Sequence, residues 1–110
     1  MEMPVKGYAS QPVIGSNEAI LHSTNDQIRF LNTPRSASIV PLYDVKGEWE
    51  AAAPGTTGNF SATAYYFGKI LYQQLQVPIG LENISYGGSP VEAFMDERTL
   101  KTFPEIKVPV

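Results

Sequence analysis

The chain has 110 residues, of which 43% are hydrophobic, a size and composition that suit one small folded domain and exclude a disordered protein. Its 8 basic and 11 acidic residues are scattered and sum to a formal charge of −3, so nucleic acid is not an expected partner. With no cysteine, one histidine and no run of about 20 apolar residues, the sequence also predicts no disulfide, no metal site, no cofactor and no membrane span.

The first part of the chain carries weak signals for regular structure. Residues 1–27 are predicted to be mostly loop, because glycine and proline interrupt any hydrophobic period, with one short helical turn at residues 17–21. Alternating side chains predict a strand at residues 28–32. A weaker strand at residues 38–43 would lie at a sheet edge, because Pro41 cannot donate a ladder hydrogen bond.

Residues 44–59 are predicted to be an irregular surface connection, because they contain three glycines and a proline. Trp49 lies within this connection. Its ring could stack on a sugar, which makes Trp49 a candidate substrate-binding residue. A large aromatic ring is more often an apolar anchor for a long loop, and that is the favoured interpretation.

The clearest helix is predicted at residues 61–76. Ser61 can cap its first amides, and Pro78 disfavours helical geometry at the residue before it, which ends the helix. Gly68, inside the apolar stripe, indicates close approach to a strand. The stripe follows spacings of three and four and must be buried; it consists of Ala64, Phe67, Gly68, Leu71 and Leu75.

An apolar strand predicted at residues 79–86 runs into two glycines and then into signals for a helix start. Ser89 as N-cap and Glu92 three residues later match a capping box, and Pro90 suits the first helical position. A last short helix is predicted at residues 97–102, capped by the carboxylate of the preceding aspartate. The order helix, strand, helix predicts an α/β fold with a parallel sheet, whose ligands bind at the carboxyl ends of the strands.

The turn between strand and helix is the main candidate site. The amides of Gly87 and Gly88 need no helical partner, and glycine lets another atom approach the backbone closely. A small anion, a phosphate or the oxyanion of an acyl-transfer reaction would fit there, and so would a tight turn with no ligand. Asn83 and Ser89 flank the glycines and are candidate substrate-binding residues, with a local bracing role as the alternative for Asn83.

A second constellation of catalytic residue types is rejected. Ser16, His22 and Asp26 are close in sequence, but no apolar strand precedes Ser16 to hold it at a strained turn. His22 is therefore predicted to be an ordinary polar loop residue.

Several of these segments resemble the sialate O-acetylesterase group of the SGNH hydrolase superfamily. Residues 87–94 are similar to its Gly-Gly-Thr/Ser turn and the following Ile/Val-Glu-Ala-Trp/Phe helix, and residues 60–68 to its Phe-Ser-Ala-x-x-Tyr-Phe-Phe-Gly segment. Trp49 and Pro54 stand where the group usually has a Trp and a Pro. Residues 1–4 resemble what directly follows the group's nucleophile motif, Gly-Gln-Ser-Asn.

The resemblance implies a partial three-layer α/β/α, flavodoxin-like fold, incomplete in this chain, with residues 1–110 as the amino-terminal part of one esterase domain. It implies a parent carboxylic ester hydrolase that deacetylates a carbohydrate by serine attack, with a histidine base. Gly88, at the group's Asn-x-x-x-x-Gly spacing from Asn83, would supply an oxyanion amide, and Gly87 is the neighbouring candidate. The serine and the Asp/His pair would lie outside this chain, which would then be inactive alone.

Two other functions stay open: a non-catalytic module that holds a glycan or small anion, and a small assembly subunit. The latter rests on apolar helix residues left without sheet neighbours, which would also permit self-association: Phe67, Leu71 and Leu75. The partner implied by the resemblance is an acetylated carbohydrate, and the parent would be secreted or periplasmic. The residues themselves fix neither the sugar, the acyl position nor the compartment.

Overall fold

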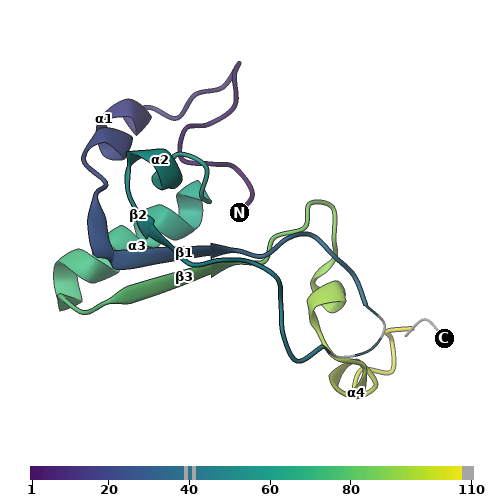
Figure 1. Ribbon diagram of the computed structural model, residues 1–110. Helices are drawn as coiled ribbons and strands as arrows, with labels where there is room; N and C mark the ends of the chain where they lie inside the picture. Colours follow the sequence, from purple (N-terminus) through teal and green to yellow (C-terminus); the bar gives the residue numbers. More distant parts are fainter. Residues whose placement is uncertain (39, 41, 108–110) are drawn as a thin grey trace.

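The computed structural model describes residues 1–38, 40 and 42–107. Figure 1 shows a small sheet with helices beside it and an extended second part toward the carboxyl end. The elements, in chain order, are α1 (Ser16–Leu21), β1 (Asn25–Asn32), β2 (Glu50–Ala52), α2 (Pro54–Thr57), α3 (Ala62–Leu75), β3 (Ile79–Asn83), the 3-10 helix η1 (Val91–Phe94) and α4 (Glu97–Leu100).

The three strands form one sheet in the order β2-β1-β3. β1 and β3 are parallel, with Ile28 opposite Ile79 and Asn32 opposite Asn83, which confirms the predicted α/β arrangement. β2 adds an antiparallel edge strand, so the sheet is mixed. This strand and α2 lie within the segment predicted to be irregular, and that part of the prediction is wrong.

The strand boundaries differ from the predicted ones at several places. β1 begins at Asn25, three residues earlier than expected, and β3 ends at Asn83 instead of reaching Tyr86. The weaker strand predicted at residues 38–43 is not formed at residues 38, 40, 42 and 43, and its other two residues lie outside the described part of the chain.

Helix α3 forms as its sequence predicts. The Ala64 amide donates to the Ser61 hydroxyl over 3.3 Å, so Ser61 is the N-cap. At the other end Gln76 adopts a left-handed conformation, with φ of 53°, and its amide donates to the Tyr72 carbonyl. Gln76, which directly precedes Val77 and Pro78, therefore caps the carboxyl end of the helix.

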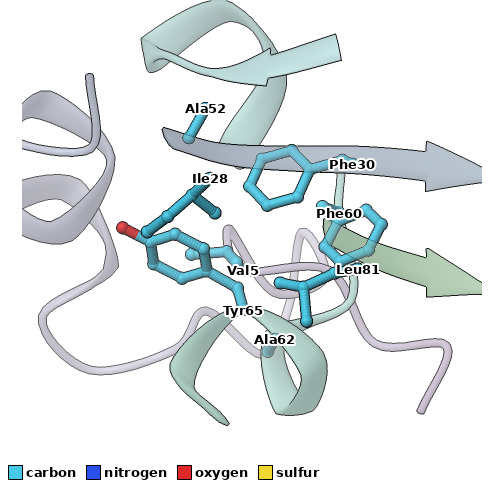
Figure 2. Packing of buried hydrophobic residues seen from close by; sticks show 8 residues of the cluster. All are labelled: Val5, Ile28, Phe30, Ala52, Phe60, Ala62, Tyr65 and Leu81. Carbon is cyan, nitrogen blue, oxygen red and sulfur yellow. The ribbon is translucent and has the colours of Figure 1, made fainter. Parts of the chain in front are cut away.

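The core lies between α3 and the inner face of the sheet (Figure 2). The Phe30 and Phe60 rings stack with centroids 4.3 Å apart, and Tyr65 meets Phe30 edge to face at 5.9 Å. Burial raises the pKa of the Tyr65 phenol, and the neighbouring Tyr66 raises it further. The buried cluster consists of Val5, Ile28, Phe30, Ala52, Phe60, Ala62, Tyr65 and Leu81.

The amino end contributes to this core, although its sequence predicts mostly loop. Residues 3–6 run antiparallel to residues 58–62, where the Val5 amide donates to the Phe60 carbonyl over 2.9 Å. The Ala62 amide donates to the Met3 carbonyl over 2.8 Å. Val5 is thereby completely buried, and the first residues of the chain are held against the start of α3.

The apolar stripe of α3 is only partly buried. Gly68 packs against Leu81 of β3, as a glycine in the stripe predicts, because a Cβ at position 68 would lie 2.5 Å from the Leu81 Cδ1. Phe67 and Leu75, placed in the stripe by their spacing, are 62% and 58% exposed. Their side of the helix faces away from the sheet and carries an unpartnered apolar surface within the described residues.

Residues 33–38 and 84–107 leave the carboxyl ends of β1 and β3 and extend away from the core (Figure 1). The radius of gyration is 16.6 Å. A compact domain of about 100 residues has a radius of roughly 13 Å. The chain is therefore elongated, and its two long connections leave the sheet at one end.

We predict that Gly68→Ala destabilises the chain. The added methyl group overlaps Leu81, at a cost of about 1–3 kcal/mol that exceeds the gain in helix propensity of about 1 kcal/mol. The measurement is urea denaturation followed by circular dichroism. Gly55→Ala is the matched control, because Gly55 is also helical and a Cβ there meets nothing within 4 Å. Equal stability of the two variants would contradict the packing argument.

We also predict that the cap of α4 is lost in acid. Hydrogen bonds from the Thr99 side chain and then from its amide, 2.8 Å from Oδ1, hold the pKa of Asp96 below its ordinary value. A lowered folded-state pKa means that the cap stabilises α4 above the ordinary pKa and is lost as pH falls through the folded value. NMR titration of the Thr99 amide should give a midpoint below that of an unstructured aspartate. In Asp96→Asn the titration should disappear.

Candidate functional site

The Gly87-Gly88 turn follows the carboxyl end of β3, on the end of the sheet where an α/β fold binds ligands. The Ser89 amide donates to the Tyr86 carbonyl over 3.2 Å and closes a four-residue turn. Gly88 has φ of +80°, the value that a type II turn requires at its third residue. Within the described residues, neither glycine amide donates a hydrogen bond to the protein.

The predicted capping box after this turn is wrong. Pro90 is extended, with φ of −71° and ψ of 160°, and is itself the residue that precedes the helical turn Val91–Phe94. Ser89 is therefore one residue too early for an N-cap, and no side chain caps η1. Ser89 lines a cavity of about 340 Å³ between the connection after β1 and the turn.

A larger cavity of about 670 Å³ lies beside the turn and joins three parts of the chain. Its wall includes residues 1–3 of the amino end, the last two residues of β3 and Phe94 of η1. Gly87 is part of this wall, whereas Gly88 is not among its lining residues. Of the two predicted glycines, Gly87 is thus the one directly at the cavity.

Asn83 lies on the cavity wall and is already engaged inside the protein. Its side-chain nitrogen donates to the Asn32 side-chain oxygen over 3.3 Å, which joins the ends of β1 and β3. Its oxygen accepts from the hydroxyl of Ser85 at 2.5 Å and from the Ser85 amide at 3.2 Å. These contacts correspond to the bracing role that was one of the two predicted for Asn83.

Trp49 lies at the other end of β3. Its ring covers Gly80, where a Cβ would be 3.4 Å from two ring carbons, and the residue is 54% exposed. The ring lines a separate cavity of about 310 Å³ together with Asp26, Gln27 and Arg29. The structure does not bring Trp49 together with the glycine turn, so any sugar stacked on it would occupy a second location.

An ion pair beside the glycine turn has no counterpart in the sequence predictions. Arg35, in the connection after β1, pairs through Nη2 with the Glu2 carboxylate. Its guanidinium carbon lies 5.8 Å from the ring centroid of Tyr86, the residue before the glycines. The resemblance of residues 1–4 to the segment after a nucleophile motif includes Glu2, but it gives Glu2 no role and does not include Arg35.

The remaining candidate groups do not form a site. His22 is exposed in the turn directly after α1, and its Nε2 lies 3.5 Å from Glu18 of that helix, which agrees with its prediction as a polar loop residue. In residues 1–38, 40 and 42–107, no three histidine or carboxylate side chains are grouped to hold a metal ion. Within the same residues no helix has the length and apolar character needed to cross a bilayer.

The amino-acid sequence is similar to those of sialate O-acetylesterases from several mammals. No family model matches the chain. Sialate O-acetylesterase of Rattus norvegicus is 38% identical over 74 residues, and that of Pongo abelii is 51% identical over 74 residues; each match covers 63% of this chain and 14% of the relative. The chain thus spans only about one seventh of these relatives' length.

A solved structure extends the relationship to the fold. A carbohydrate acetylesterase from Xanthomonas citri superposes with a TM-score of 0.81 and 36% sequence identity, over 94% of this chain and 23% of that one. The superposition includes nearly the whole chain, so the fold of this chain is shared with part of that structure. The predicted resemblance is confirmed in sequence and in fold: over the part that it spans, this chain is similar to sialate O-acetylesterases and has the fold of a carbohydrate acetylesterase.

Proposed function

We propose that this chain is the amino-terminal part of a carbohydrate-directed O-acetylesterase domain and supplies its oxyanion-binding glycine turn. The observation that carries the proposal is a turn with uncommitted glycine amides, beside a cavity of about 670 Å³ at the carboxyl end of a parallel strand pair. Acetylesterases among the relatives support this reaction class.

In the proposed reaction a serine hydroxyl attacks the acetyl carbon while a histidine accepts its proton. The carbonyl oxygen becomes negatively charged, and amides of the Gly87-Gly88 turn donate hydrogen bonds to it. The bond between the acetyl carbon and the sugar oxygen then breaks, and the protonated histidine gives its proton to that oxygen, so the sugar leaves as an alcohol. Water, deprotonated by the same histidine, attacks the acetyl-serine, which releases acetate and restores the serine hydroxyl. The serine, the histidine and its carboxylate partner belong to the remainder of the proposed enzyme.

The substrate class proposed is an acetylated carbohydrate. The sequence relatives are sialate O-acetylesterases and the structural relative is a carbohydrate acetylesterase, which supports an acetyl ester on a sugar without naming the sugar. Self-association is a further part of the proposal. It would use exposed apolar residues of α3: of the predicted Phe67, Leu71 and Leu75, Leu71 is half-buried, whereas Phe67 and Leu75 are exposed and Ile70 is exposed as well.

A non-catalytic glycan-binding module is the alternative. It is favoured by the second cavity, where the half-exposed Trp49 ring lies beside the polar side chains of Asp26, Gln27 and Arg29. A stacked ring and a few hydrogen-bonding groups suit a sugar without any chemistry. Turnover that depends on the glycine turn would exclude this alternative as the main function.

We predict that Gly88→Val, in an esterase that contains this chain, lowers kcat for acetyl-ester hydrolysis by about 10²–10³-fold, the effect of losing one oxyanion donor. A β-branched residue is strained at φ of +80°, so the turn changes geometry although the amide is retained. KM should change little, because the interaction is made mainly in the transition state.

Gly15→Val is the matched control for this experiment. Gly15 has φ of +78° and, like Gly88, meets nothing within 4 Å of a Cβ, but it precedes α1 and does not line the cavity. Equal losses of kcat in both variants, or an unchanged kcat in Gly88→Val, would contradict the oxyanion assignment.

We also predict that this chain alone does not hydrolyse a chromogenic acetate ester above a buffer blank. In the described residues the single histidine is a surface group paired with Glu18 and does not line the cavity beside Gly87. Hydrolysis that disappears in Ser16→Ala would show that the rejected triad of Ser16, His22 and Asp26 is catalytic.

A further inference from the structure

The Glu2 carboxylate lies directly against the glycine turn. A Cβ at Gly87 would collide with Glu2 Oε1 and would lie 3.5 Å from its carboxyl carbon. Glu2 also forms part of the cavity wall, and its side chain is 28% exposed. The absence of a side chain at Gly87 therefore admits a negatively charged group next to the amides of the turn.

This arrangement raises an electrostatic difficulty for the proposed reaction. A carboxylate beside the turn repels the negative charge that develops on the carbonyl oxygen of the substrate. Glu82 adds a second carboxylate to the same wall, although Thr33 donates its hydroxyl to it over 3.3 Å. Among the described residues that line the cavity there is no cationic side chain to compensate.

Arg35 provides the compensation from just outside the cavity. Its guanidinium pairs with Glu2 Oε2, while Oε1 of the same carboxylate faces Gly87. The guanidinium also lies 5.8 Å from the Tyr86 ring centroid, so one side chain contacts both the carboxylate and the residue that begins the turn. Arg35 thus connects the amino end, the connection after β1 and the glycine turn.

We propose that Arg35 is a positioning residue of the acetylesterase site, which neutralises Glu2 and fixes the Gly87-Gly88 turn so that an oxyanion can bind there. The inference rests on the proposed function of the turn. It assigns no contact with the substrate to Arg35. The proposal predicts that removing the Arg35 side chain lowers kcat mainly because the Glu2 carboxylate then remains charged and unpaired.

The first test measures kcat and KM for acetyl-ester hydrolysis in an esterase that contains this chain. Arg35→Ala should lower kcat by about tenfold or more with less than about threefold change in KM, because the unpaired carboxylate opposes the transition-state charge. Arg35→Lys should recover most of the loss, since it restores the charge. The double variant Glu2→Gln/Arg35→Ala should also recover activity relative to Arg35→Ala.

The recovery separates charge compensation from a merely structural ion pair. If the pair acted only as a brace, Glu2→Gln/Arg35→Ala would be as inactive as Arg35→Ala or worse, and that result would overturn the inference. Lys101→Ala is the matched control, because Lys101 and Glu97 form an exposed ion pair on α4 at 2.7 Å. A loss of kcat in Lys101→Ala equal to that in Arg35→Ala would also overturn it.

The second test uses this chain itself and does not depend on catalysis. In ¹H–¹⁵N spectra, Arg35→Ala should shift the amide resonances of Tyr86, Gly87 and Gly88, whereas Lys101→Ala should leave them in place. Unmoved resonances would refute the positioning role whatever the enzyme assays give. Shifted resonances together with an unchanged kcat in Gly88→Val would retain the positioning role and refute the oxyanion function of the turn.

Discussion

The parallel pairing of β1 with β3 is the contact on which the remaining structure depends. Five residue pairs stay in register from Ile28 opposite Ile79 to Asn32 opposite Asn83, and the Thr33 amide continues the ladder by donating to the Asn83 carbonyl over 2.9 Å. Because parallel strands point the same way, both following connections leave the sheet at one end. Arg35 and the glycine turn are neighbours for this reason.

The sequence was sufficient where local chemistry decides the structure. The signals that begin and end helix α3 lie in the residues directly beside it, and the Asp96 cap of α4 is equally local. β2 could not be predicted, because three residues beside Pro54 become a strand only by pairing with β1. Likewise β3 ends at Asn83 because its partner β1 ends at Asn32, although apolar residues continue beyond it.

The candidate site was predictable in part for the same reason. Two adjacent glycines after an apolar strand indicate a turn with accessible amides, and the structure contains that turn. The predicted helix start after it is wrong by one residue, because local signals do not specify whether Pro90 lies inside or before the helical turn. The pairing of Glu2 with Arg35 joins residues 33 positions apart, and Glu2 is placed by the contact of the amino end with the start of α3, which no local pattern encodes.

The location of the single tryptophan has a spectroscopic consequence. Trp49 rests on Gly80 near the amino end of β3, remote from the glycines beyond its carboxyl end. The emission wavelength of Trp49 therefore depends on how far solvent reaches that end of the sheet, and we expect it to shift when unfolding separates the ring from Gly80. Trp49 does not line the cavity beside Gly87, so we expect its emission to report on the folding of the sheet and not on a ligand bound at the turn.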